Sequence, residues 1–245
     1  GFFQGLTEFL PISSSGHLLL LGIDMDTTII LHFGTVFSIL IYYKKFIIEN
    51  IKQFINGDRK LLYFVIIGCL PISIVGFLGK NSIESFFYFE TNSFVPPKAL
   101  IYTYMLTAIF LFLSKNVIQN KQLTFKIVLI VGLLQILALL PGVSRSGITI
   151  SGSRILGYTR YESIRLSMLM SIPTIIGSGV LLAPGLFKEP YDTSFFEIMV
   201  AFTLSFLSSF LALTFLIKYI YRFQFTPYII YRILLGFLLL WFVYS

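Results

Sequence analysis

Two short polar stretches stand out in this chain, and the first reads QGLTEFLPISSSGHL from Gln4 to Leu18. It brings a carboxylate, three consecutive serines and a histidine within a few residues of one another. Because a proline disfavours the α conformation in the residue before it, we expect a first helix to end near Leu10. The serines are then good N-caps for a second helix that includes His17.

These residue types predict a cation site beside an anion site. Gln4 and Glu8 lie four positions apart and therefore share one face of the first helix. A carboxylate in the last turn of a helix faces the negative end of the helix dipole, which favours a neighbouring cation or proton. The free N–H groups at the start of the serine-capped helix favour an anion.

The second polar stretch, from Gln135 to Thr149, reads QILALLPGVSRSGIT. An apolar half-helix again ends at a proline, and a serine-arginine-serine sequence opens another helix. A planar guanidinium, hydroxyls and helix N–H groups together match a phosphate. The predicted phosphate ligands here are Ser144, Arg145, Ser146, Gly147 and Thr149.

Each chemical role has a simpler alternative. Glu8 is either a metal ligand or proton acceptor, or only the structural counter-ion of Arg145. His17 is an acid or base, a phosphorylated nucleophile or a packing residue. Ser14 is a nucleophile or phosphate ligand, and at least one of its neighbours is only a helix cap.

His32, inside an apolar run, is interpreted as a structural residue. An interfacial charge network is expected from Arg154, Arg160, Glu162 and Arg165.

Composition indicates an all-α polytopic membrane protein. Of the 245 residues, 56% are hydrophobic and 12% are charged, whereas about 25% are charged in typical soluble domains. An arginine at the centre of a membrane span costs about 2.5–3.5 kcal/mol or more, so it is normally paired and functional. Arg145 is therefore the strongest single indication of a site, and the alternative is an arginine that reaches the membrane surface. The chain begins with Gly1 rather than methionine, and we expect residues before it.

The two stretches recur at a nearly fixed offset, which predicts an internal duplication. Gln135 lies 131 positions after Gln4, and Pro141 lies 130 positions after Pro11. Broken helices in duplicated membrane proteins typically meet near the midplane and bind anions there. Irregular backbone at that depth must be covered by protein or water, so we expect the two hairpin tips to contact each other.

Each predicted repeat has a broken re-entrant helical hairpin and three transmembrane helices. The first repeat is residues 1–120 with its hairpin at 1–22, and the second is 121–245 with its hairpin at 127–157. Because three is an odd number of crossings, the second repeat enters the membrane from the opposite side to the first. The chain is therefore predicted to form two inverted-topology repeats, with six full crossings in one membrane domain. Excess basic charge puts the loop at 44–60 in the cytoplasm. The expected crossings are residues 28–43, 61–78, 99–113, 160–183, 195–217 and 228–244.

The two motifs together resemble the signature pair of the bacterial undecaprenyl pyrophosphate phosphatases, the bacitracin-resistance family. The similarity extends over the whole chain, through the hydropathy profile to the closing segment FTPYIIYR. It implies hydrolysis of undecaprenyl diphosphate to undecaprenyl phosphate and inorganic phosphate. That reaction recycles the lipid carrier of peptidoglycan synthesis and confers bacitracin resistance.

The resemblance also assigns site residues and a cofactor. Many members have glutamate where this chain has Gln4, so a mechanism that needs two carboxylates is not supported. Members use magnesium or calcium, which implies Mg²⁺ or Ca²⁺ at Glu8, with Gln4 as a second ligand. The catalytic positions fall on Glu8, Ser14, His17 and Arg145. The substrate-binding positions fall on Gln4, Ser13, Ser15, Ser144, Ser146, Gly147 and Thr149.

The implied partners are undecaprenyl diphosphate and membrane lipids, without nucleic acid, and a homodimer is left open. The implied location is the bacterial inner (plasma) membrane, with the active site open to the outer face.

Two rival functions are weighed against this one. Type-2 phosphatidic-acid phosphatases need a further histidine six residues after their arginine, where this chain has Ser151, so that rival fails. A transporter or flippase of an anionic polyprenyl phosphate lipid remains the alternative, because broken inverted hairpins are also found in transporters.

Overall fold

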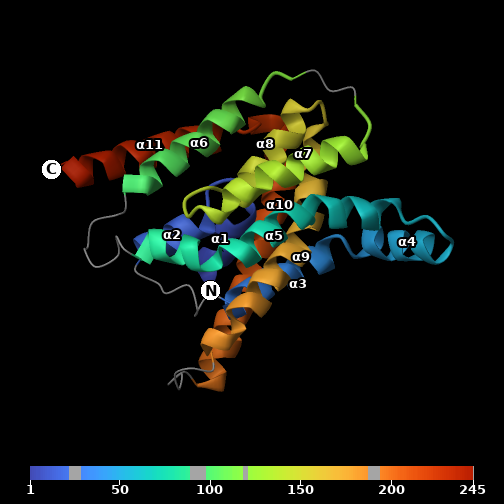
Figure 1. The fold of residues 1–245 in the computed structure, drawn as a ribbon, viewed down its shortest axis with the longest axis horizontal. Helices are drawn as coiled ribbons and strands as arrows, with labels where there is room; N and C mark the ends of the chain where they lie inside the picture. The colour runs from blue at the N-terminus through green and yellow to red at the C-terminus, as the bar shows by residue number, and fades with distance from the viewer. Residues whose placement is uncertain (22–28, 89–97, 118–120, 187–193, 245) are drawn as a thin grey trace.

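The computed structural model describes residues 1–21, 29–88, 98–117, 121–186 and 194–244, and these residues form helices and connections without a strand (Figure 1). In chain order the elements are α1 (Phe2–Phe9), α2 (Ser14–Leu20), α3 (Ile29–Tyr42), α4 (Lys44–Ile55), α5 (Lys60–Tyr88), α6 (Lys98–Leu113), α7 (Phe125–Gln135), the 3₁₀ turn η2 (Ile136–Leu139), α8 (Arg145–Ile155), α9 (Arg160–Leu186), α10 (Phe195–Phe223) and α11 (Thr226–Tyr244).

Several of these helices can cross a membrane, which confirms a multi-pass all-helical membrane protein. Four described helices are long and apolar enough, and α3 with α4 makes a fifth if this pair, bent by 75°, counts as one span. The helix α6 is apolar but shorter. The four spans are Lys60–Gly79, Arg160–Val180, Phe195–Ile220 and Thr226–Val243.

Residues 44–60, which the sequence predicted to be a basic loop, are instead mostly the helix α4, so the predicted loop conformation was wrong. Ile48, Ile51 and Ile55 recur at helical spacing and leave an exposed apolar stripe on α4. The lysines of this segment, which suggested a loop, lie on an amphipathic helix without a buried residue.

The first helix break falls where the proline rule predicts it. α1 ends at Phe9, and Leu10 before the proline is extended, with φ −68° and ψ 143°. Ser13 has a left-handed φ of 75° and caps α2, its hydroxyl accepting from the Gly16 N–H at 3.3 Å. The sequence thus produces two short helices that meet at a polar turn.

The second break repeats this construction. The chain turns through Gly142, whose φ of 87° favours glycine, and a Cβ there would clash with the Thr103 side chain. Ser144 then caps α8, its hydroxyl accepting from the Gly147 N–H at 3.1 Å.

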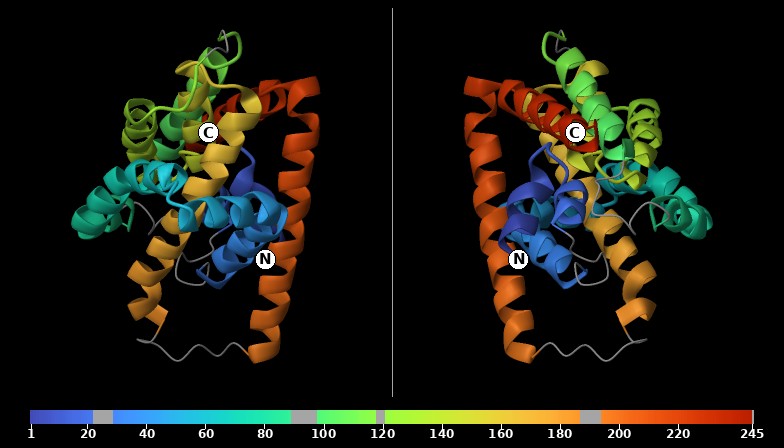
Figure 2. Two further views of the ribbon diagram at one scale, coloured as in Figure 1. Left: turned by 90° about the vertical axis from the view of Figure 1, so that its right-hand side faces the viewer. Right: turned by 90° about the vertical axis from the view of Figure 1, so that its left-hand side faces the viewer.

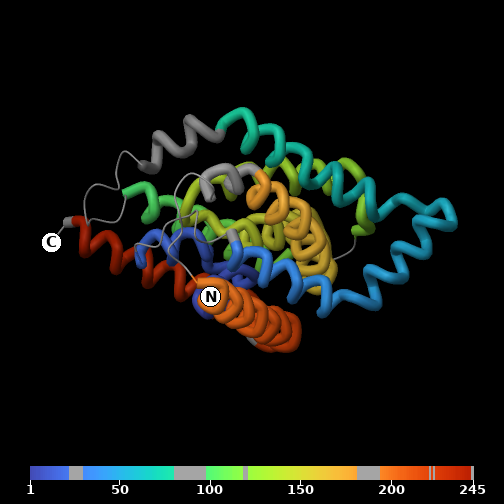
Figure 3. The backbone as a smooth tube through the Cα atoms, turned by 90° about the horizontal axis from the view of Figure 1, so that it is seen from below, coloured from blue at the N-terminus to red at the C-terminus, as the bar shows by residue number. Residues whose placement is uncertain are grey.

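The helices pack in reciprocal pairs around the two breaks. On one side, α1 and α3 both lie against α10. On the other, the corresponding helices α7 and α9 both lie against α5. α6 and α11 lie side by side at one end of the molecule, while α9 and α10 extend beyond the other helices at another (Figures 1 and 2). Seen from below, α1 lies close to the long helix α10, which is viewed nearly end-on (Figure 3). The largest buried cluster includes Phe9, Ile39, Ile150, Met168, Leu213 and Phe225.

Candidate active site

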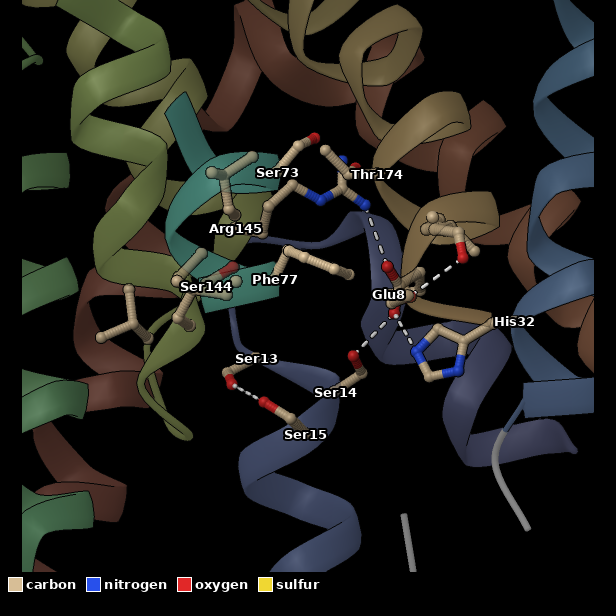
Figure 4. A pocket seen from close by; sticks show the side chains of 18 residues that line it. Glu8, Ser13, Ser14, Ser15, His32, Ser73, Phe77, Ser144, Arg145 and Thr174 are labelled. Atoms are coloured by element: carbon tan, nitrogen blue, oxygen red, sulfur yellow. Dashed lines mark hydrogen bonds and ion pairs between the residues drawn. The ribbon is translucent and has the colours of Figure 1, made fainter. Parts of the chain in front are cut away.

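A cavity of about 420 Å³ is lined by both breaks (Figure 4). One side of it is apolar and comes from α5 and α9, where Ile72, Phe77 and Ile175 line the wall. The polar side draws on both sequence motifs. Its lining residues are Glu8, Ser13, Ser14, Ser15, His32, Ser73, Ser144, Arg145, Thr174 and Ser178.

Glu8 connects the two motifs. Arg145 Nη2 donates to Glu8 Oε1 at 2.9 Å, and Ser14 Oγ donates to Glu8 Oε2 at 2.7 Å. Gln4 Nε2 also donates to Oε2 at 2.9 Å, as the four-residue spacing predicts. The Glu8 side chain is only 8% exposed, so this carboxylate is buried and surrounded by donors.

Arg145 is held in a fixed orientation at the start of α8. Its Nη1 donates to the Ser167 carbonyl of α9 at 3.3 Å while its Nη2 pairs with Glu8. The side chain lines the cavity and is 13% exposed, so it does not extend to the surface. The nearby Ser146 Oγ donates to the Leu10 carbonyl at 3.1 Å, which confirms that the two tips contact each other.

His32, interpreted from the sequence as a structural residue inside an apolar run, lies beside Glu8 at the cavity. Its Nε2 lies 3.7 Å from Glu8 Oε2, and its side chain lines the cavity. The contact joins α3 to α1, two helices whose proximity the sequence did not reveal. An ionisable residue inside an apolar span is itself a functional signal, and that signal could have found His32.

His17, predicted as an acid or base, does not line the cavity. Its Nδ1 lies 2.5 Å from the Ser13 carbonyl oxygen, and its Nε2 lies 2.5 Å from the Tyr231 hydroxyl of α11. The two rings are stacked, with centroids 5.7 Å apart. Both ring nitrogens therefore have partners, and the contact of Nε2 with Tyr231 joins α2 to α11.

Other predicted ligands lie behind the cavity lining. Gln4 is fully buried and supports Glu8, and its Oε1 has no hydrogen-bond partner. Thr149 donates to the Arg145 carbonyl at 2.8 Å and shares a 2.6 Å hydrogen bond with the Ser167 hydroxyl. Gly147 contributes its N–H to the Ser144 cap. These residues support the cavity lining.

Two arginines differ from expectation. Arg154 was predicted at an interface, but it is fully buried and donates to the carbonyls of Tyr158 and Ser114 at 2.9 and 3.0 Å. Arg232, for which the sequence predicted no role, is also fully buried and contacts both helix breaks. Of the charge network expected here, Arg165 and Glu162 form an ion pair.

The donor set near Glu8 fits a divalent cation that arrives with phosphate. Among the described residues, no three His, Cys, Asp or Glu side chains gather as a metal cage. Glu8 nevertheless offers a carboxylate, Ser14 a hydroxyl, and Gln4 a buried carboxamide oxygen without a donor. Magnesium in phosphate sites typically takes one or two carboxylates together with substrate oxygens.

The fold and the site define a class: a multi-pass helical membrane protein in which two helix breaks build one cavity from a carboxylate, an arginine and serines. Such a donor set beside an apolar wall suits a phosphorylated lipid.

The chain belongs to the family described as bacitracin resistance protein BacA, which matches residues 1–238. A protein of Alteromonas mediterranea named undecaprenyl-diphosphatase is 34% identical over 263 residues, covering 99% of this chain and 96% of that protein. Proteins with the same name from Pelagibacter ubique and Mycolicibacterium smegmatis are 33% and 36% identical, covering 99% and 95% of this chain and 94% and 90% of those proteins. The family resemblance predicted from the two motifs is confirmed.

Proposed function

We propose that this protein hydrolyses undecaprenyl diphosphate to undecaprenyl phosphate and inorganic phosphate. The observation that carries the proposal is the Glu8–Arg145 pair, which joins the two motifs in a cavity with an apolar wall. The relatives named undecaprenyl-diphosphatase over nearly the whole chain support the same reaction. It would recycle the lipid carrier for peptidoglycan synthesis, and the family's description connects it with bacitracin resistance.

In this proposal Arg145 and the starts of α2 and α8 hold the diphosphate. The guanidinium offers paired donors to phosphate oxygens, and the helix N-termini add N–H groups and a favourable dipole. Ser13, Ser15 and Ser144 line the same space and supply hydroxyls. Preorganised donors of this kind stabilise the charge that develops on a transferred phosphoryl group.

The nucleophile we propose is Ser14, because its hydroxyl already donates to Glu8 Oε2 at 2.7 Å. Its Oγ attacks the terminal phosphorus, its proton passes to Glu8, and the bridging P–O bond breaks to release undecaprenyl phosphate. Water then hydrolyses the phosphoserine, which releases inorganic phosphate and restores the serine hydroxyl. His17 has no acid or base role here because it faces α11.

A Mg²⁺ or Ca²⁺ ion is part of the proposal, held by Glu8 and Gln4. When bound, it would supply positive charge to the phosphate oxygens. The carboxamide oxygen of Gln4, buried without a donor, supports this assignment. Gln4 has no acid–base role because an amide does not exchange a proton with substrate at neutral pH.

We further propose two inverted repeats, residues 1–120 and 121–245, with six crossings in the bacterial inner membrane. The reciprocal packing of α1 on α10 and of α7 on α5 supports a duplication of this kind. The positive-inside rule gives the orientation, with the region around 44–60 in the cytoplasm and the site open to the outer face. A homodimer is compatible with this arrangement.

The test is phosphate release by the purified protein in detergent micelles with undecaprenyl diphosphate and magnesium. A phosphatase releases inorganic phosphate under these conditions. A transporter or flippase of a polyprenyl phosphate lipid forms no product without two compartments, so absence of phosphate release with intact lipid movement in vesicles would favour that alternative.

A further inference from the structure

Arg232 has an unusual position for a charged residue. It lies in the second turn of the apolar helix α11, and its side chain is fully buried. No carboxylate in the described ranges forms an ion pair with it. A buried charge is costly unless donors and acceptors are matched, so the question is what its guanidinium binds.

All the hydrogen bonds of this guanidinium go to backbone carbonyls. Nη2 donates to the Gly142 carbonyl at 2.8 Å and to the Thr103 carbonyl at 3.2 Å. Nη1 donates to the Pro11 carbonyl at 3.4 Å, and Nε donates to the Tyr104 carbonyl at 3.1 Å. The guanidinium carbon also lies 4.8 Å from the centre of the Tyr104 ring.

Two of these carbonyls belong to the two helix breaks. Pro11 follows the end of α1, and Gly142 lies in the turn before α8. A broken helix in a membrane leaves carbonyls without intrahelical partners, and there is no bulk water at that depth to satisfy them. One side chain therefore satisfies a carbonyl of each of the two helix breaks.

The two tips are close enough for such a bridge to set their spacing. A Cβ on Gly16 would come within 3.1 Å of the Gly142 Cα, so α2 nearly touches the second tip. The neighbouring Tyr231 adds a contact from the same helix to His17 at 2.5 Å. α11 thus contacts α2 and both turns.

We propose that Arg232 is a positioning residue that clamps the two hairpin tips at the spacing the active site requires. It does not touch the cavity, since it is absent from the cavity lining. It acts through Pro11 and Gly142, whose positions fix the starts of α2 and α8. The kinetic part of its test rests on the proposed phosphatase function, whereas the structural part does not.

Lysine in place of Arg232 keeps the charge but cannot replace the clamp. Arginine has five N–H donors in a planar fork, and lysine has three on one nitrogen, which cannot reach carbonyls on three segments at once. Arg154 provides a matched control, because it too is fully buried and donates only to carbonyls, away from the cavity.

The experiment compares Arg232→Lys with Arg154→Lys by hydrogen exchange and by turnover. Exchange is followed at the Ile12 and Val143 amides, which bond within the two tips. We expect both amides to exchange about tenfold faster in Arg232→Lys only. Because a displacement of about 1 Å can cost 10²-fold in rate, we expect kcat on undecaprenyl diphosphate to fall about 100-fold. Arg154→Lys should instead change exchange at Tyr158.

The proposal is contradicted if the Ile12 and Val143 amides keep their exchange rates in Arg232→Lys, or if only one of them exchanges faster. It is also contradicted if Arg232→Lys and Arg154→Lys increase these rates equally. Unchanged kcat with loosened tips would also overturn it as a positioning residue. If Arg232→Lys does not fold, Arg232→Gln, which removes the buried charge and keeps two donors, is measured in the same way. If the wild type releases no phosphate, the proposed function fails, and exchange alone then decides whether Arg232 holds the tips.

Discussion

Glu8 is the residue through which both motifs act on one ligand. Its two carboxylate oxygens are divided between the motifs, with Arg145 on Oε1 and Ser14 on Oε2. The pairing fits a simple counter-ion as well as an active site. The two interpretations differ in what happens when either partner is replaced, and variants at single residues can separate them.

Replacing Arg145 with lysine should reduce kcat/KM on undecaprenyl diphosphate by about 10²–10³-fold, the range for loss of one preorganised donor to a developing charge. Lysine keeps the charge but lacks the bidentate fork that matches phosphate oxygens. The measurement is steady-state phosphate release in detergent. Arg165→Lys, at an ion pair whose residues do not line the cavity, is the control and should stay near wild type. A fully active Arg145→Lys variant would show that Arg145 is only a counter-ion of Glu8.

Replacing Glu8 with glutamine should abolish metal-dependent turnover, because a hard divalent cation prefers a carboxylate to a neutral amide. Gln4→Glu should be tolerated or should lower the magnesium concentration needed for half-maximal activity. Both expectations are tested by measuring phosphate release at increasing magnesium concentration for each variant, with Glu162→Gln as the control. Identical titration curves for wild type and Glu8→Gln would exclude Glu8 as a metal ligand.

At the scale of elements, the site depends on where helices stop. Pro11 predicted the end of α1, and the serines predicted the capped starts of α2 and α8, because these are local rules of backbone geometry. The turn at Gly142 adds a steric condition, since Thr103 of α6 occupies the space where a side chain would point.

Gly142→Ala should destabilise the protein by about 1–3 kcal/mol, because alanine is strained at a positive φ and its methyl group meets Thr103. Gly57→Ala is the matched control: its φ of 97° is also left-handed, but nothing lies within 4 Å of a Cβ there. Chemical unfolding in detergent should show the larger loss for Gly142→Ala. Equal losses would mean that the close approach of α6 contributes nothing.

Contacts between distant segments marked the limit of prediction from the sequence. Local rules correctly grouped Gln4, Glu8 and Ser14 and indicated Arg145. They could not show that α3 brings His32 to Glu8, or that His17 turns toward Tyr231 on α11. Both depend on tertiary packing of helices far apart in the chain, which no periodicity or capping rule encodes.

At the scale of the whole molecule, the charge pattern is proposed to set the direction in which the site faces. The region from Lys44 to Lys60 is rich in lysine, and the start of α10 carries Glu197. The positive-inside rule therefore places Asn56 in the cytoplasm and the start of α10 outside. Both Asn56 and Phe195 are exposed, so they are suitable labelling positions.

Single cysteines at these two positions, in a Cys69→Ala background, test the orientation in intact cells with a membrane-impermeant maleimide. We expect Phe195→Cys to react and Asn56→Cys to react only after the membrane is permeabilised. The opposite labelling pattern would indicate the opposite orientation in the membrane, with the site open to the cytoplasm.

The central claim is that the cavity between the two tips directs attack on the terminal phosphorus of a lipid diphosphate. Hydrolysis in ¹⁸O-labelled water, with mass spectrometry of both products, tests it most directly. We expect ¹⁸O in the inorganic phosphate, none in undecaprenyl phosphate, and about 10²–10³-fold slower product formation by Arg145→Lys. Label in the lipid phosphate, or release of pyrophosphate, would contradict it.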